Sequence, residues 1–340
     1  MSRIIIEEVL AQPQTVTWLP WAVQYFFFIG LSACAALLAC VARWARPEKS
    51  AVFEGRCLFI ALTCGITAPL ALTADLHQTA RFWHFYAWPT PWSWMPWGAL
   101  FLPLFTLLLG LWFLLFHLRH VMPRGVPSMR WLAFGAALTA VGLLLYTGRE
   151  VSVVRARPLW FSYWYPLVMF ASAMSALLAL LMTVMRTQRD LVRLLAKGLV
   201  VTLLLLGAVM MAWFYGDTLS GEALRQQWLL NAEMRFYALV VIALWGISLA
   251  CALCASRYAL PMGATLTVTL VGAAMCWLLR WAFVIGGQEI PKFNALMNAW
   301  TLPSGTDGWL AIIGTLGLWF ALMITVREGV NWLSRRLQHA

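Results

Sequence analysis

Nine long apolar stretches, separated by mostly short loops, account for almost the whole chain. Of the 340 residues, 62% are hydrophobic and 11% are charged, which is too little charge to cover a water-soluble domain of this size. Stretches of about 20 apolar residues are typical of membrane-crossing helices, because backbone groups in lipid must be hydrogen-bonded within the helix. The sequence therefore predicts an all-α, polytopic integral membrane protein.

The fourth of the nine expected spans is the least distinct. It is short and meets the charged pair Arg149–Glu150, beyond which it could continue as a helix. No segment resembles a separate soluble domain, so residues 1–340 are expected to form a single helical membrane domain. The expected spans are approximately 19–42, 57–75, 98–118, 131–148, 160–185, 194–215, 236–255, 260–284 and 309–330.

The basic residues predict the orientation of these spans. If the N-terminus lies outside, most of the 24 Lys and Arg residues fall in the inside loops and the C-terminal segment. The outside loops then hold nearly balanced numbers of bases and acids. Positively charged loops remain on the cytoplasmic side, so we expect the N-terminus outside and the C-terminus inside. The net charge of +11 is thus a topological signal and does not indicate nucleic-acid binding.

The histidines and cysteines argue against a metal cofactor in this chain. A haem in a helical bundle usually needs two histidines on different helices at similar depth. His77 and His84 share one outside loop, whereas His117 and His120 share the inner end of the third span. The seven cysteines lie inside apolar spans or at their inner edges, as small packing residues do, and lack iron–sulfur spacing. We therefore expect neither haem nor an iron–sulfur cluster, and no metal site.

Three polar residues lie within about one turn of the outer ends of their spans. Asp75 ends the second span, where a carboxylate can accept a proton; the alternative is a water-exposed helix end or a pair with Arg81. Tyr146 in the fourth span can hydrogen-bond a ligand carbonyl, or can belong to the aromatic belt. Arg280 in the eighth span either extends to the headgroups or pairs with an internal carboxylate or ligand.

Gln24 and Tyr25 of the first span lie at the same level, so residues of four spans share one depth near the outer surface. Their sideways proximity cannot be inferred from the sequence. A pocket there, apolar below and polar above, suits a ligand with a lipid-soluble tail and a redox head, namely a quinol. The candidate catalytic residues are Asp75, Tyr146 and, from its chemistry alone, His77. The candidate quinol-binding residues are Gln24, Tyr25, Asp75, Tyr146 and Arg280.

The outside loop 77–97 holds five of the 21 tryptophans, together with Arg81, Phe82, Phe85 and Tyr86. Tryptophans at the headgroup level are often membrane anchors. Aromatic residues with arginine are also enriched at protein interfaces. The loop can serve as an anchor, as a platform for a partner protein, or as both.

Several motifs of the sequence resemble those of the NrfD-like family, typified by the polysulfide reductase membrane subunit. The motifs follow one another in family order along the chain, and together they are specific. They are Tyr25 to Gly30, Ala74 to Leu76, Arg81 to His84, Ser93 to Gly98, Tyr146 to Gly148, Arg157 to Trp160, Leu279 to Trp281 and Gly286 to Gln288.

The resemblance implies a haem-free subunit of the bacterial inner membrane that oxidises quinol, with menaquinol as the expected carrier. It implies docking on a periplasmic iron–sulfur subunit, which passes electrons to a molybdopterin catalytic subunit, with tetrathionate or another sulfur compound as the expected acceptor. Family roles carry over to Asp75 and Tyr146 most directly. The sequence departs from the family pattern at Arg149–Glu150, where apolar residues are expected, and at Pro96.

Three other interpretations remain open at this stage. A secondary transporter would place ionisable groups near the bilayer midplane, where these spans hold essentially no acid. A haem-handling assembly protein would suit the Trp-rich loop with its flanking histidines. A purely structural membrane anchor would leave the quinone site to another polypeptide.

Overall fold

The computed structural model describes residues 16–45, 50–119, 129–290 and 300–338. Within these residues the chain is helical, and nine of its helices are long and apolar enough to cross a membrane, as predicted. The long helices are α1 (Pro20–Ala45), α2 (Ala51–Asp75), α4 (Met95–Leu118), α5 (Met129–Ser152), α6 (Trp164–Val184), α7 (Arg189–Tyr215), α9 (Ala232–Arg257), α10 (Met262–Val284) and α12 (Trp309–Gln338). The short elements are η1 (Thr79–Arg81), α3 (His84–Ala87), α8 (Leu219–Leu230) and α11 (Gly286–Glu289). His120 lies outside the described residues.

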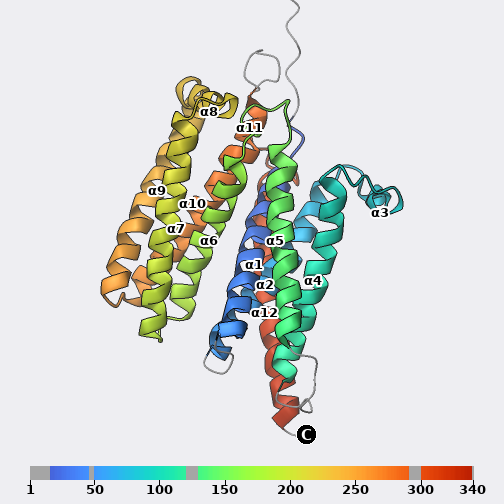
Figure 1. The fold of residues 1–340 in the computed structure, drawn as a ribbon, viewed down its shortest axis with the longest axis vertical. Coiled ribbons are helices and arrows are strands. Elements are labelled where there is room, and N and C mark those ends of the chain that lie inside the picture. The colour runs from blue at the N-terminus through green and yellow to red at the C-terminus, as the bar shows by residue number, and fades with distance from the viewer. Residues whose placement is uncertain (1–15, 46–49, 120–128, 291–299, 339–340) are drawn as a thin grey trace, which may run out of the picture.

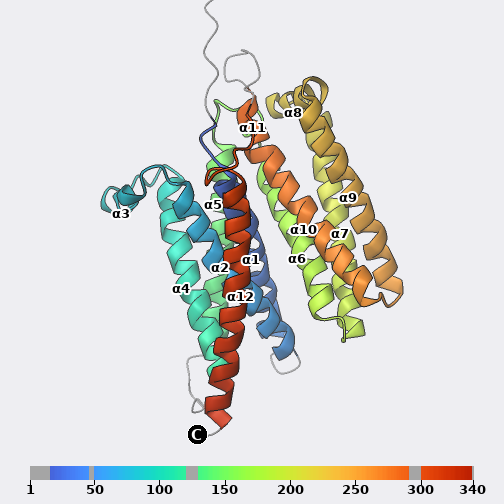
Figure 2. The ribbon, with the colours of Figure 1, turned by 180° about the vertical axis from the view of Figure 1, so that it is seen from behind.

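The long helices form two side-by-side groups (Figures 1 and 2). Helices α1, α2, α4, α5 and α12 make up the first group, and α6, α7, α9 and α10 the second. The two groups meet where α1 packs against α6 and α10 and where α5 packs against α6. We call the end at which α1 begins the upper end, as in Figure 1; α3, α8 and α11 also lie there.

Helix α1 occupies the centre of the structure. It packs against α2, α5, α6, α10 and α12, and most of its side chains are buried. Its second half is rich in small residues such as Ala35, Ala36 and Ala39, all fully buried. In a membrane, small residues allow helix backbones to approach closely, and packing replaces the hydrophobic effect as the force that joins helices. The composition of α1 therefore suits its central position.

The fourth span is longer than its apolar stretch. Helix α5 continues through Arg149 and Glu150 to Ser152, so the charged pair lies inside its last turns. By contrast, the segment from Arg157 to Trp160 is not part of the fifth long helix, which begins at Trp164. The orientation of the helices in the membrane, and the assignment of residues 1–340 to a single domain, stay predictions.

A buried ion pair joins α1 to α2 at the lower end. Arg43 donates two hydrogen bonds to Glu54 Oε1, from Nε at 2.9 Å and from a terminal nitrogen at 2.6 Å. Trp112 of α4 donates a third hydrogen bond to the same oxygen at 3.0 Å. The Glu54 side chain is fully buried. Its carboxylate is the hydrogen-bond acceptor for both the Arg43 guanidinium and the Trp112 indole.

We expect Glu54→Ala to destabilise the protein by about 3–5 kcal/mol, because it leaves a buried guanidinium without its counter-charge. Thermal unfolding in detergent would measure this. The control is Asp190→Ala, which removes the exposed Arg193–Asp190 pair with its 4.0 Å separation. That variant should unfold at the wild-type temperature, since exposed pairs contribute little. Equal unfolding temperatures for both variants would contradict a structural role for Glu54.

Candidate functional site

The upper end of the structure is tied together by Gln288 in α11. Its Oε1 accepts hydrogen bonds from the backbone N–H groups of Thr17 at 2.9 Å and Trp18 at 3.0 Å. Its Nε2 donates to the Trp18 carbonyl at 3.0 Å. Arg157 donates from one nitrogen to the carbonyls of Gln288 at 2.7 Å and Ile290 at 3.0 Å. These bonds hold the segment that leads into α1 against the end of α10.

A second contact at the same place explains one of the glycine motifs. Trp160 donates its indole N–H to the Phe283 carbonyl at 2.7 Å, and its ring packs against that of Trp18 at 5.1 Å between centroids. A Cβ atom on Gly287 would lie 2.1 Å from the Trp160 indole nitrogen, so position 287 has no room for a side chain. The motifs 157–160 and 286–288, distant in sequence, are thus one packed joint.

Asp75 lies beside this joint, at the beginning of α1. Its Oδ1 accepts a hydrogen bond of 3.1 Å from the backbone N–H of Leu19, directly before the helix. A carboxylate is stabilised at a helix N-terminus by the free N–H groups and the helix dipole. Asp75 is half-buried and also interacts electrostatically with His77, which is exposed, and with Glu150. Asp75 takes part in neither ion pair found among the described residues, so the predicted alternative of an Asp75–Arg81 pair is wrong.

Glu150 connects the predicted site residues to one another. It lies one turn after Tyr146 on the same face of α5, and its carboxylate interacts with the Tyr146 hydroxyl. It also interacts electrostatically with Asp75 of α2, Tyr25 of α1 and Tyr165 of α6. The structure therefore brings Tyr25, Asp75 and Tyr146 together around a carboxylate that the sequence analysis treated as a departure from the family.

Two phenol hydroxyls in this cluster are buried without a hydrogen-bond partner among the described residues. They belong to Tyr25, which is 1% exposed, and Tyr165, which is 0% exposed. A buried hydroxyl without a partner costs free energy, and such groups are uncommon in native proteins. Two of them beside one carboxylate indicate a place where a ligand with oxygen atoms can bind. The cluster of Tyr25, Asp75, Tyr146, Glu150 and Tyr165 is named the tyrosine–carboxylate cluster below.

The sequence analysis missed Tyr165 and did not assign Glu150 to the site. Glu150 carried a usable signal, because its i+4 spacing places it on the face of Tyr146. Tyr165 had no such signal, since it stands among Tyr163 and Trp164 at a helix start and resembles an aromatic-belt residue.

Gln24 and Arg280 lie outside the cluster. Gln24 donates to the Ile312 carbonyl at 3.2 Å and accepts from the Trp277 indole at 3.3 Å, so it joins α1 to α12 and α10. Because consecutive helix residues are about 100° apart, Gln24 and Tyr25 face different directions. A role for Gln24 in binding a ligand stays a prediction, and its amide already has two partners.

Arg280 is 1% exposed and lies where the two helix groups meet. Its guanidinium donates to the carbonyls of Phe26 at 2.9 Å, Met169 at 3.0 Å and Cys276 at 2.8 Å, and to Ser172 Oγ at 3.1 Å. These acceptors come from α1, α6 and α10, so Arg280 holds three helices together. Its interaction with Tyr165 connects it to the edge of the tyrosine–carboxylate cluster. Its predicted contact with a ligand stays a prediction.

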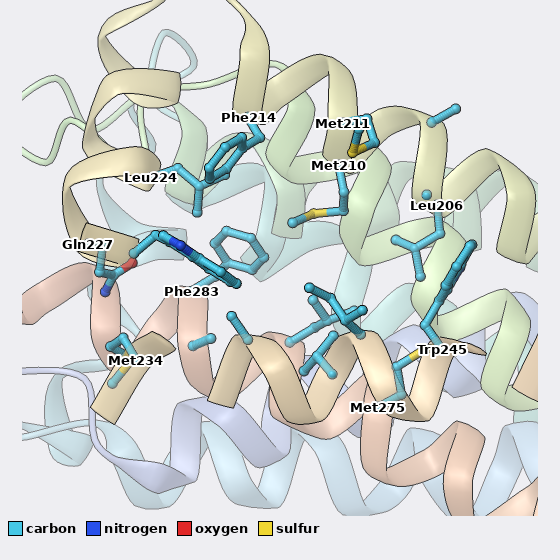
Figure 3. Close-up of a pocket in the computed structure, with 18 of the residues that line it drawn as sticks. Leu206, Met210, Met211, Phe214, Leu224, Gln227, Met234, Trp245, Met275 and Phe283 are labelled. Atoms are coloured by element: carbon cyan, nitrogen blue, oxygen red, sulfur yellow. The ribbon is translucent and has the colours of Figure 1, made fainter. Parts of the chain in front are cut away.

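Two cavities lie beside α10. The first, of about 580 Å³, is almost entirely apolar and lies between α7, α8, α9 and α10. Figure 3 shows Phe214, Leu224 and Phe283 at one end of this cavity and Trp245 and Met275 at the other. The Phe283 ring stacks on Trp213 at 4.9 Å and lies 6.2 Å from the Tyr165 ring, so it separates this cavity from the cluster.

The second cavity, of about 390 Å³, is lined by side chains of α9, α10, α11, α12 and the segment 300–302. Its walls include Trp277, Trp281 and Trp300 together with Glu233 and Glu289. Trp277 is the residue that donates to Gln24. Gln24 is therefore hydrogen-bonded to two residues that line this cavity, Trp277 and Ile312.

The fold and this cluster define a polytopic helical membrane protein with titratable groups gathered at one end of the bundle. The model of the family described as "Polysulphide reductase, NrfD" matches residues 8–292. This chain belongs to the NrfD family, which confirms the resemblance carried by the motifs. The ninth long helix, α12, follows the matched region and packs against α1 and α2.

Two relatives are named as subunits of reductases. One, from the tetrathionate reductase of Salmonella typhimurium, is 56% identical over 338 residues, which cover 99% of this chain and 98% of that protein. The other, from the selenate reductase of Mesobacillus selenatarsenatis, is 28% identical over 206 residues, which cover 49% of this chain and 47% of that protein.

The packing around Tyr146 yields a prediction. A Cβ atom on Gly98 of α4 would lie 2.0 Å from the Tyr146 ring, so Gly98→Ala must displace that ring. We expect this overpacking to destabilise the protein by about 1–3 kcal/mol, measured by thermal unfolding in detergent. Gly110→Ala on the same helix is the control, because a Cβ there meets open space. A Gly98→Ala protein as stable as Gly110→Ala would show that the Tyr146 ring is not held as described.

Proposed function

We propose that this chain is the membrane subunit of a molybdopterin reductase complex and oxidises quinol at the tyrosine–carboxylate cluster. The single observation that carries this proposal is the pair of buried, partnerless hydroxyls of Tyr25 and Tyr165 next to Asp75 and Glu150 in the described part of the chain. Quinol oxidation supplies two electrons and two protons. The cluster offers what such a ligand needs from the protein, which is hydrogen-bonding oxygens and carboxylates that accept protons.

Three residues of the cluster, together with His77, have roles in this proposal. The hydroxyls of Tyr25 and Tyr165 would orient the two oxygens of the ligand's head group, since they have no competing partner in the described structure. Asp75 would accept a proton at its carboxylate while Leu19 N–H keeps the side chain in place. His77, exposed beside Asp75, would pass that proton to water. Burial of the phenols would exclude water from the head group.

The electrons leave for partner proteins. Both relatives are named as one subunit of a reductase, which implies further subunits in those enzymes. For this chain we propose an iron–sulfur partner and a molybdopterin catalytic subunit on the periplasmic side of the bacterial inner membrane. Support comes from the exposed aromatic side chains that follow α2 at the upper end, close in sequence to Asp75. They include Phe82, Trp83, Tyr86, Trp88 and Trp92.

We propose menaquinol as the carrier and tetrathionate as the terminal acceptor. The second choice rests on the 56% identity to a tetrathionate reductase subunit across nearly the full length of both chains. The upper end would then face the periplasm, in agreement with the orientation that the basic loops predict.

Asp75→Asn tests the proposed function directly. The amide oxygen can still accept the Leu19 hydrogen bond, but it cannot take up a proton at neutral pH. We expect menaquinol oxidation by the purified complex, with tetrathionate as acceptor, to fall at least about 100-fold, as for loss of a proton acceptor. The iron–sulfur and molybdopterin subunits should still co-purify in mild detergent.

Asp217→Asn is the matched control, because Asp217 is an exposed carboxylate at the upper end of the second helix group. It should leave the rate unchanged. A normal rate in Asp75→Asn would exclude Asp75 as the proton acceptor. Purification of the wild-type chain without an iron–sulfur protein would overturn the proposed function itself.

Tyr165→Phe tests ligand binding separately from stability. Its hydroxyl has no partner in the described structure, so its removal should leave the unfolding temperature unchanged or raise it. If the hydroxyl binds a ligand oxygen, the affinity for a quinol-site inhibitor should fall about 10-fold. Tyr237→Phe is the control, because that hydroxyl already bonds Glu233 at 2.8 Å on α9. Unchanged inhibitor affinity in Tyr165→Phe would remove Tyr165 from the site.

A further inference from the structure

Glu150 is the carboxylate of the cluster that has no role in the proposed function. It lies near the end of α5, half-buried, one helical turn from Tyr146 on the same face. This i,i+4 placement sets the Glu150 carboxylate next to the Tyr146 side chain, with which it interacts. Within the described residues that hydroxyl has one other neighbour, Met95 Sδ at 4.0 Å, which is a weak acceptor. Of the two groups, the Glu150 carboxylate is the one that can take up a proton.

The neighbouring arginine does not neutralise this carboxylate. Arg149 donates from one terminal nitrogen to Ser152 Oγ at 3.2 Å, and its guanidinium lies over the ring of Tyr163 at 5.0 Å and that of Trp94 at 5.9 Å. Consecutive residues of a helix point about 100° apart, so the two side chains diverge. The ion pairs found within the described residues, Arg43–Glu54 and Arg193–Asp190, do not involve Glu150.

Described residues of α1, α2 and α6 present oxygen groups to Glu150, and no described cation forms an ion pair with it. Helix α1 contributes Tyr25, α2 contributes Asp75 and α6 contributes Tyr165. Helix α4 contributes Gly98, whose missing side chain makes room for the Tyr146 ring. Asp75 and Glu150 repel each other when both are ionised, so uptake of a proton by either one relieves that repulsion.

We propose that Glu150 is the second proton acceptor of the site and receives its proton through the Tyr146 hydroxyl. This inference rests on the proposed function, in which quinol is converted to quinone with release of two protons and two electrons. Asp75 takes one proton. Tyr146 takes the other at its oxygen while its own proton moves to a Glu150 carboxylate oxygen. The two electrons leave to the iron–sulfur partner, so charge and atoms balance.

Glu150→Gln is the variant that tests this inference. The amide oxygen can still accept the Tyr146 hydrogen bond, so the position of the phenol is kept while the capacity to bind a proton is lost. We expect quinol oxidation by the purified complex to fall about 100-fold. Inhibitor affinity and unfolding temperature should remain within the range of the wild type, because neither depends on proton uptake.

Infrared difference spectroscopy supplies a readout that does not depend on turnover. Addition of menaquinol to the oxidised complex should produce carboxylic-acid C=O bands from protonated Asp75 and Glu150. The Glu150→Gln protein should lack one of these bands, and Asp75→Asn should lack the other. Glu233→Gln is the matched control, because Glu233 accepts a hydrogen bond from Tyr237 at the same i,i+4 spacing but is exposed on α9. It should keep both bands and the full rate.

The outcomes separate this inference from the proposed function. A full rate and both bands in Glu150→Gln, with a large loss in Asp75→Asn, would overturn the role of Glu150 and leave the proposed function standing. Full rates in both variants would overturn the proposed function. A loss of rate in Glu150→Gln with both infrared bands intact would show that the side chain only positions Tyr146, which also overturns proton uptake by Glu150.

Discussion

In a bilayer, a buried polar group must find its partner inside the protein, and this requirement organises the whole structure. The guanidinium of Arg280 donates hydrogen bonds to three backbone carbonyls from three helices, and that of Arg43 donates to the Glu54 carboxylate. Each of these solutions also fixes how helices pack. The hydroxyls of Tyr25 and Tyr165 differ from these groups, because they lack a partner among the described residues and lie at one end of the bundle beside two carboxylates.

The site depends on the meeting of the two helix groups. Tyr25, Asp75, Tyr146 and Glu150 come from the first group, and Tyr165 from the second. Arg280 and the joint made by Gln288 hold the groups together directly around this place. In the proposed site, Arg280 and Gln288 would act indirectly, because they join the helices that carry the five oxygen-bearing side chains.

The family motifs contain two kinds of residue that the sequence does not separate. The segments 157–160 and 286–288 form a packed joint, in which Arg157 and Trp160 bond to backbone carbonyls and Gly287 leaves space for an indole ring. Tyr146 and Asp75, from other motifs, belong to the tyrosine–carboxylate cluster. All of these residues lie in motifs that resemble the family, and the second kind supplies the carboxylate and phenol groups of the proposed site.

The sequence by itself determined the nine long helices seen in the described part of the chain, because the length and apolarity of each span follow from the thickness of the bilayer. It also determined the depth of Asp75, Tyr146 and Tyr25, since position along a span is position across the membrane. Sideways proximity was decided by the tertiary structure, through the direction in which each helix face points and the neighbour it packs against. The tertiary structure shows that Gln24 bonds to Trp277 and that Glu150 interacts with Asp75. Tyr165 comes from the other helix group, so its interaction with Glu150 could not be predicted from the sequence.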